Sequence, residues 1–137
     1  MNKNLTIFTD GGARGNPGPA GIGVVILDEQ KNIVKGLKKY IGEATNNVAE
    51  YQALILALKT AVEMGAENLK INMDSELVVR QMQGRYKIKD PGLKILAAEV
   101  LKLCSQFASV NFQHVPREQN QAADKLVNEA IDEQLNG

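Results

Sequence analysis

The order of apolar patterns along the chain constrains the fold more than any other feature of the sequence. Three β-rich runs come first, and from Asn47 onward apolar residues recur at steps of three and four, the spacing of an amphipathic helix. We expect strands at residues 5–9, 20–27, 32–41, 69–73 and 110–115, and helices at residues 47–65, 75–83, 93–104 and 120–135. This order predicts an α/β protein with one five-stranded mixed sheet, covered by helices on both faces.

The length and composition exclude several classes of protein. No repeat, low-complexity tract or linker interrupts the 137 residues, so we expect residues 1–137 to form a single domain. Cys104 is the only Cys, and one Cys with one His can form neither an internal disulfide nor a zinc site. The start at Met1 has no signal-peptide pattern, and the longest wholly apolar run, residues 53–58, is too short to span a bilayer. We expect a cytoplasmic monomer with no membrane segment.

The formal net charge is zero, because 16 Lys and Arg residues balance 16 Asp and Glu residues. The chain therefore lacks the broad positive field by which most nucleic-acid-binding proteins attract their ligand. Phosphate binding still fits this composition if bound cations supply the positive charge.

Four acidic residues fall where the predicted fold would bring them together. Asp10 ends the first strand, Asp74 ends the fourth, Glu50 lies in the first turn of a helix, and Asp124 lies early in the last helix. If the first and fourth strands are parallel neighbours, their carboxyl ends share the sheet edge where open α/β sheets usually bind ligands. A carboxylate cluster without His favours Mg²⁺ or Mn²⁺ over softer metals. Two such ions about 3.5–4 Å apart can activate a water and stabilise the leaving oxygen of a phosphodiester.

Each acid also has a purely structural explanation. Asp10 with the glycine after it is a common turn dipeptide. Glu50 could be the third-position partner of a capping box that begins at Asn47. Asp74 could cap the short helix that follows it, and Asp124 could simply complement the positive end of its helix. Four unrelated structural acids need not share one edge of one sheet, so their conjunction favours a metal site.

Five stretches of the sequence resemble the type 1 ribonuclease H family: Thr9–Gly12, Gly15–Gly21, Thr45–Glu50, Met73–Ser75 and Asn120–Asp124. They follow the family's order and span nearly the whole chain. The resemblance implies a ribonuclease H-like fold, with strands one to three antiparallel and strands four and five parallel to the first. It also implies an endonuclease that hydrolyses the RNA strand of RNA/DNA hybrids and leaves 5′-phosphate and 3′-hydroxyl ends. The implied metal ligands are Asp10, Glu50, Asp74 and Asp124, holding two Mg²⁺ ions, for which Mn²⁺ would substitute.

Selectivity for RNA requires groups that sense a 2′-hydroxyl from the minor groove, because side chains cannot read the deep major groove of an A-like duplex. Asn46 and Asn47 are the candidates, since each amide offers a donor and an acceptor. The Gly11-Gly12 backbone would permit a close approach of substrate. Similarity to the family adds Thr45 and Asn16 as contacts to phosphates of the DNA strand. The alternative is that residues 45–47 form an ordinary helix entry.

The loop before Asp124 departs from the family pattern. Many members carry a mobile His in a longer loop there, whereas this chain has only residues 115–119. His114, the sole His, matches the end of the preceding strand rather than the mobile residue. Arg117 is the better candidate for a catalytic role, because a guanidinium can bind the scissile or product phosphate with two hydrogen bonds. The alternative is a solvated Arg117 paired with Glu118.

A second departure lies between the short helix and the helix at residues 93–104. Some relatives insert a basic helix and loop there as a handle on the hybrid, and this chain has only residues 84–91, with three basic residues around Tyr86 and Ile88. We expect a solvated surface loop. Fewer phosphate contacts then predict weak substrate binding with a shallow dependence on salt.

Other functions fit the sequence less well. Gly12, Gly15 and Gly18 suggest a nucleotide site, but such a site needs a helix directly afterwards, and residues 20–27 read as a strand. We therefore expect no small-molecule cofactor. Two alternatives remain open: a nuclease of the same fold that acts on another structured nucleic acid such as duplex RNA, and a hybrid-binding module without catalysis. Without the four acids, 12 acidic residues remain against 16 basic ones, so the rest of the chain is formally +4.

Overall fold

The computed structural model describes residues 3–137, and Met1 and Asn2, where the expected domain begins, lie outside the described residues. The elements in chain order are β1 (Asn4–Ala13), β2 (Gly18–Leu27), β3 (Ile33–Ala44), α1 (Asn46–Glu63), β4 (Asn68–Met73), α2 (Glu76–Met82), α3 (Pro91–Cys104), β5 (Ser109–His114), the 3₁₀ helix η1 (Arg117–Asn120) and α4 (Gln121–Asn136). Every strand and helix expected from the sequence is present. None of the helices in this part of the chain is long and apolar enough to cross a membrane.

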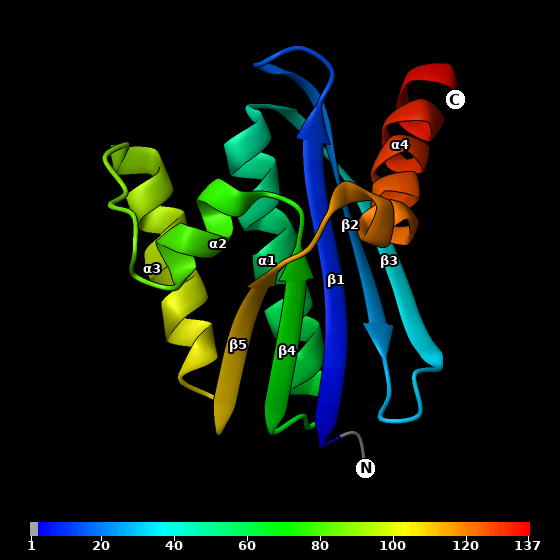
Figure 1. Cartoon of the computed structure of the whole chain (residues 1–137). Helices are drawn as coiled ribbons and strands as arrows, with labels where there is room; N and C mark the ends of the chain where they lie inside the picture. The colour runs from blue at the N-terminus through cyan, green and yellow to red at the C-terminus, as the bar shows by residue number, and fades with distance from the viewer. Residues whose placement is uncertain (1–2) are drawn as a thin grey trace.

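The five strands form one mixed sheet with the order β3-β2-β1-β4-β5. β1, β2 and β3 are antiparallel neighbours, β4 lies parallel to β1, and β5 lies parallel to β4. The predicted sheet is therefore confirmed. β1, β4 and β5 run in the same direction, and β1 continues past the ends of β4 and β5 (Figure 1).

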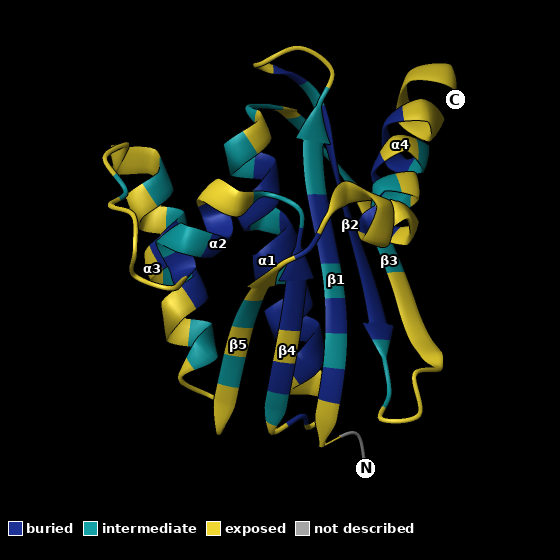
Figure 2. Ribbon diagram, in the orientation of Figure 1, coloured by how far each residue is buried: buried dark blue, intermediate teal, exposed yellow. Residues whose placement is uncertain are grey.

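Helices cover both faces of this sheet. α1 packs on one face against β1 and β2, with α3 beside it, while α4 packs on the other face against β1, β2 and β3. Glycines in β2 allow α4 to approach the sheet closely, because a Cβ on Gly21 would lie 2.8 Å from the Val127 carbonyl oxygen, and one on Gly23 would meet the Ala123 carbonyl oxygen. The main core lies between the sheet and α1, where large side chains such as Ile7, Ile26, Tyr51, Leu54, Leu58 and Ile71 are fully buried (Figure 2).

The first strand is longer than the sequence predicts. β1 continues past Asp10 to Ala13, and β2 begins at Gly18, so Asp10 pairs with Gly23 and does not end a strand or begin a turn. The expected end of the first strand at Asp10 is therefore wrong, and so is the alternative of a turn at Asp10-Gly11. The reversal instead lies at residues 14–17, where the Arg14 N–H donates to the Pro19 carbonyl at 2.9 Å and the Asn16-Pro17 peptide is cis.

The burial of α1 also differs from its predicted stripe. The apolar residues spaced at three and four along the sequence are Val48, Tyr51, Ile55, Leu58 and Val62. Val62 is nevertheless 36% exposed, whereas Ala53, Leu54 and Ala57 are buried although they lie outside this stripe. The reason is that α1 has neighbours on two sides, the sheet and α3, so a single apolar stripe does not describe it.

Candidate active site

Three acids from separate parts of the chain meet at the carboxyl edge of the sheet. Asp10 comes from β1, Glu50 from α1, and Asp74 directly follows β4. One carboxylate oxygen from each lies within 4.8 Å of the others. Asp10 and Glu50 are buried, Asp74 is half-buried, and all three line a cavity of about 510 Å³. The fold therefore brings Asp10, Glu50 and Asp74 together, as expected from the sequence.

Gly11 determines how closely Glu50 approaches Asp10. Its backbone N–H donates to Glu50 Oε1 at 2.7 Å and to Asp10 Oδ1 at 3.0 Å. The approach requires glycine, because a Cβ on Gly11 would overlap the backbone of Ala49 and lie 2.6 Å from the Glu50 nitrogen. The close approach that this glycine permits is therefore that of helix α1 to strand β1.

Helix capping does not account for Glu50 or Asp74. Thr45, not Asn47, caps α1, since its Oγ1 accepts from the Val48 N–H at 3.2 Å, so Glu50 is not the partner in a capping box. Ser75 caps α2, with its Oγ accepting from the Val78 N–H at 3.3 Å. Both acids therefore lack the structural roles that the sequence left open for them.

The pKa values of the two buried acids, Asp10 and Glu50, are raised because these carboxylates are buried close to other acids. Burial, with repulsion from Asp74 and then Asp124, raises the pKa of Asp10 to about 8. Burial, followed by repulsion from Asp10 and Asp74, raises the pKa of Glu50 well above its usual range. Carboxylates forced together in this way bind protons or cations readily. Their oxygen atoms fit a hard divalent cation such as Mg²⁺ or Mn²⁺.

Asp124 lies in the first turn of α4 and lines the same cavity beside the three-acid group. Arg117, at the start of η1, also lines the cavity, and its Nη2 lies 4.0 Å from Asp124 Oδ1. The Arg117 side chain is 81% exposed, so its guanidinium can reach an incoming anion. Its ionic partner is therefore Asp124, where the sequence suggested Glu118.

Asn46 and Asn47 line the cavity together with Gly11 and Gly12. Asn46 Oδ1 accepts from the Ala13 N–H at 2.8 Å, and this bond leaves the amide N–H groups of Asn46 to donate to a ligand. Asn16 Oδ1 accepts from the Asn46 backbone N–H at 3.0 Å, so the donors of Asn16 are likewise not used in that bond. Thr45, the N-cap of α1, and Asn16 are not among the residues that line the cavity.

The sequence analysis missed Arg14, which also lines the cavity. Its Nη1 lies 2.6 Å from Asp132 Oδ1, and its Nη2 donates to Asn128 Oδ1 at 3.3 Å, so it ties the β1–β2 turn to α4. A basic residue inside a Gly-rich turn was the available signal. His114, by contrast, is exposed at the end of β5, outside the set of residues that line the cavity.

The sequence and the structure are both similar to those of proteins named ribonuclease H. A family model described as reverse transcriptase-like matches residues 8–130. LC11-RNase H1, solved in complex with an RNA/DNA hybrid, has a TM-score of 0.92 and 53% identity, over 96% of this chain and 99% of that one. The ribonuclease H of Desulforamulus reducens is 34% identical over 140 residues, which cover 90% of this chain and 85% of the relative. The chain belongs to the type 1 ribonuclease H family.

One similar ribonuclease H domain is part of a larger protein. A bifunctional protein of Mycobacterium tuberculosis is 48% identical over 129 residues, which cover 93% of this chain and 35% of that protein. The chain thus spans about a third of the length of its mycobacterial relatives.

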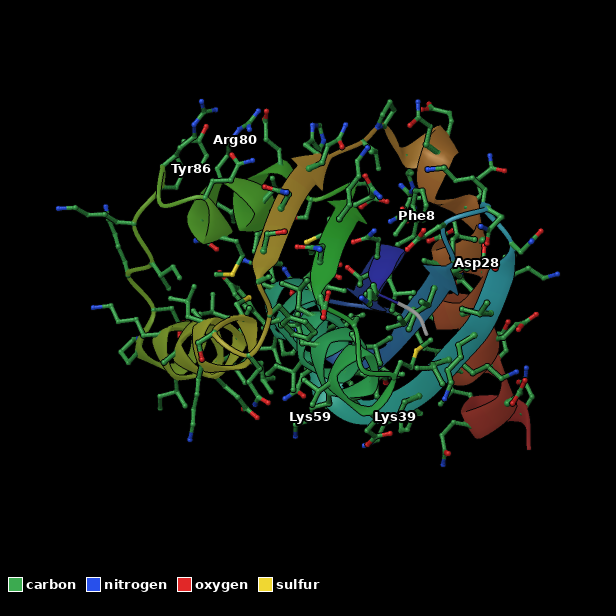
Figure 3. All side chains as sticks on the ribbon, turned by 90° about the horizontal axis from the view of Figure 1, so that it is seen from below. Phe8, Asp28, Lys39, Lys59, Arg80 and Tyr86 are labelled. Atoms are coloured by element: carbon green, nitrogen blue, oxygen red, sulfur yellow. The ribbon has the colours of Figure 1, made fainter. Side chains whose placement is uncertain are left out.

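The segment between α2 and α3 differs from the ribonuclease H members that carry a basic handle. Residues 83–90 contain no helix, and Arg85, Tyr86, Lys87 and Lys89 are exposed. The N–H groups of Arg85 and Tyr86 donate to the Arg80 carbonyl, which holds the start of the segment against α2, where Figure 3 shows Arg80 and Tyr86 close together. Ile88 packs against the core. The expected solvated loop is confirmed.

Proposed function

We propose that this protein is an endonuclease that hydrolyses the RNA strand of RNA/DNA hybrids and leaves 5′-phosphate and 3′-hydroxyl ends. The observation that carries the proposal is the meeting of Asp10, Glu50 and Asp74 within 4.8 Å in a chain of the type 1 ribonuclease H family. The similarity to LC11-RNase H1, which was solved with a hybrid, supports this choice of substrate. A binding module without catalysis would gain nothing from buried carboxylates that face a polyanion.

The four acids Asp10, Glu50, Asp74 and Asp124 would hold two Mg²⁺ ions, with Mn²⁺ as a substitute. Bound ions of this kind supply an activated water and stabilise the departing 3′ oxygen. The raised pKa values of Asp10 and Glu50 support a site that is completed by cations, because metal charge would offset the repulsion among these carboxylates.

The residues around the acids would bind and orient the hybrid. Asn46 and Asn47 would recognise 2′-hydroxyls through the minor groove, and Gly11 and Gly12 line the same cavity. Asn16 and Thr45 would contact the DNA strand.

Arg117 would bind the scissile or product phosphate through its guanidinium, whose fork of donors matches two phosphate oxygens. It cannot act as a general base at neutral pH.

We also propose that residues 1–137 work as one domain, as a monomer and without a small-molecule cofactor, in the cytoplasm. Sedimentation equilibrium with and without hybrid tests the monomer directly.

The test is to incubate the protein with labelled RNA/DNA hybrid, duplex RNA, duplex DNA or single-stranded RNA, in Mg²⁺, Mn²⁺ or EDTA. We expect metal-dependent cleavage of RNA in the hybrid and its loss in Asp10→Asn. Asp90→Asn is the matched control, because Asp90 caps α3 through a 3.0 Å bond to the Leu93 N–H, a role that Asn also fills. Cleavage in EDTA, or an undiminished rate in Asp10→Asn, would contradict the mechanism, and faster cleavage of duplex RNA would reassign the substrate.

A further inference from the structure

Asn120 joins two strands next to the acidic group. It is the last residue of η1, directly before α4, and it is only 1% exposed. Its Nδ2 donates to the Thr9 carbonyl oxygen at 2.9 Å and to Asp74 Oδ2 at 3.2 Å. One amide therefore uses its two N–H bonds on the backbone of β1 and on a carboxylate at the end of β4.

These bonds join the Asp74 carboxylate to the two segments that carry Asp10 and Asp124. Thr9 directly precedes Asp10 in β1, and Asn120 lies one turn before Asp124 in the chain. The bond to Asp74 Oδ2 limits rotation of that carboxylate, which is only half-buried and would otherwise be able to turn toward solvent. The bond to the Thr9 carbonyl fixes the amide itself. The Asn120 amide thus links the Asp74 carboxylate to the backbone of Thr9, next to Asp10.

The stability of the fold alone does not explain an amide at this position. Asn120 Oδ1 is buried and has no hydrogen-bond partner among residues 3–137, and a buried acceptor without a partner costs stability. Only the donor half of the side chain makes hydrogen bonds. The amide at this position therefore serves to donate hydrogen bonds to two oxygens, those of the Thr9 carbonyl and the Asp74 carboxylate.

We propose that Asn120 is a positioning residue for the metal site, which orients the Asp74 carboxylate toward the oxygens of Asp10 and Glu50. Partners that hold metal-ligating carboxylates typically change metal affinity 10- to 100-fold when they are removed. The inference rests on the proposed function only in requiring that these acids bind a divalent cation. It does not depend on which nucleic acid is cut.

Asn72 provides a matched control. It is also a buried amide, 4% exposed, and its Nδ2 donates to the Ile7 carbonyl of β1 at 3.4 Å. Like Asn120 it connects to the backbone of β1, but the bond it makes involves no carboxylate. Asn72→Ala therefore shows what the loss of a buried amide beside β1 does to stability.

The experiment titrates Mn²⁺ into Asn120→Ala, Asn120→Ser, Asn72→Ala and the wild-type protein without substrate, followed by electron paramagnetic resonance. Each variant is studied at a temperature where circular dichroism shows it to be folded, and Asn120→Ser keeps a small polar group in case Asn120→Ala does not fold. We expect both Asn120 variants to bind Mn²⁺ at least about tenfold more weakly, and Asn72→Ala to remain within about twofold of the wild-type affinity. In hybrid cleavage, the Mg²⁺ concentration for half-maximal rate should rise by a similar factor while the KM for hybrid stays unchanged.

Wild-type Mn²⁺ affinity in a folded Asn120 variant, equal losses in Asn72→Ala, or no Mn²⁺ binding by the wild-type protein would each overturn the inference. Normal Mn²⁺ binding by the wild type without hybrid cleavage would instead contradict the proposed function, so the two failures are distinguishable.

Discussion

The Gly11 amide nitrogen lies 2.7 Å from Glu50 Oε1, which joins strand β1 to helix α1 at the acidic site. The same N–H donates to Asp10 Oδ1 at 3.0 Å, so one donor is shared between two acids of the cluster. Such sharing requires the backbones of β1 and α1 to be in contact. A residue with a Cβ at position 11 would clash with the α1 backbone and prevent this contact.

Gly11→Ala should therefore destabilise the fold strongly. Its methyl group would overlap the backbone of Ala49, and backbone cannot move aside as a flexible side chain can. We expect a loss of about 3 kcal/mol or more in the free energy of unfolding, measured by urea denaturation. Gly12→Ala is the control, because its methyl group would lie 3.8 Å from Val127 Cγ1, an ordinary contact, and should cost less than about 1 kcal/mol. Equal losses in the two variants would contradict the packing argument.

Asp10→Asn should stabilise the metal-free protein, and more so at high pH. The pKa of Asp10 is raised from 3.8 to about 8 in the folded state, so between these values the folded state binds more protons than the unfolded state. The contribution of Asp10 to stability therefore falls as pH rises through this window. We expect Asp10→Asn to raise the Tm in EDTA by several degrees or more at pH 8, equivalent to about 1 kcal/mol or more, and by little near pH 4.5.

The Tm values of Asp10→Asn and of the wild-type protein are measured by calorimetry across this pH range. Asp90→Asn, which removes an exposed carboxylate, should show no gain that grows with pH. A gain in Asp10→Asn that is the same at pH 4.5 and pH 8 would show that repulsion and burial of the ionised Asp10 are not its cause.

Metal binding should release protons and should strengthen as pH rises. The raised pKa values of Asp10 and Glu50 mean that a cation must displace protons from these acids near neutral pH. We expect Mn²⁺ affinity to increase between pH 6 and pH 8, by up to about tenfold per pH unit for each proton released, and Mn²⁺ at about 100 times its Kd to add about 2.7 kcal/mol to stability. Titration calorimetry in two buffers of different ionisation enthalpy counts the released protons. An affinity that does not change with pH would be inconsistent with protonated acids in the free site.

The sequence predicted the order of strands and helices along the chain, because a change of apolar period marks where strands give way to helices. The parallel pairing of β1 with β4, which brings Asp10 and Asp74 to one edge, was implied by the resemblance to the family rather than by a local pattern. The sequence alone could not predict which residue caps α1. Thr45 and Asn47 are both good N-cap residues, and the first of them is used because β3 continues to Ala44 and delivers the chain into the helix there.

The sequence also could not predict contacts between segments that are far apart in the chain. Asp10-Gly11 has the composition of a turn, and it remains in a strand because Gly11 pairs with Ile22 and fits against Ala49. Asn120 contacts Asp74, 46 residues away, and no local pattern marks such a bond. Residues that tune the acids are therefore visible only in the folded molecule.

Arg117→Ala should weaken hybrid cleavage, because the 81% exposed guanidinium beside Asp124 is placed to bind phosphate. We expect kcat/KM to fall about 10- to 100-fold, equivalent to about 1.4–2.7 kcal/mol of transition-state stabilisation. Arg117→Lys should recover only part of this loss, since an ammonium cannot form the paired hydrogen bonds. Lys59→Ala is the charge-matched control, because Lys59 (labelled in Figure 3) pairs with Glu99, which joins α1 to α3.

The salt dependence of hybrid binding identifies the role of Arg117. Each phosphate contact contributes about 0.9 to the slope of log affinity against log salt, so Arg117→Ala should lower that slope by about one, and Lys59→Ala should leave it unchanged. The exposed loop at residues 83–90 provides no basic helix, so the wild-type slope should itself be shallow. A steep wild-type slope that Arg117→Ala leaves intact would place the phosphate contacts elsewhere. Normal kcat/KM in Arg117→Ala would remove this residue from the mechanism.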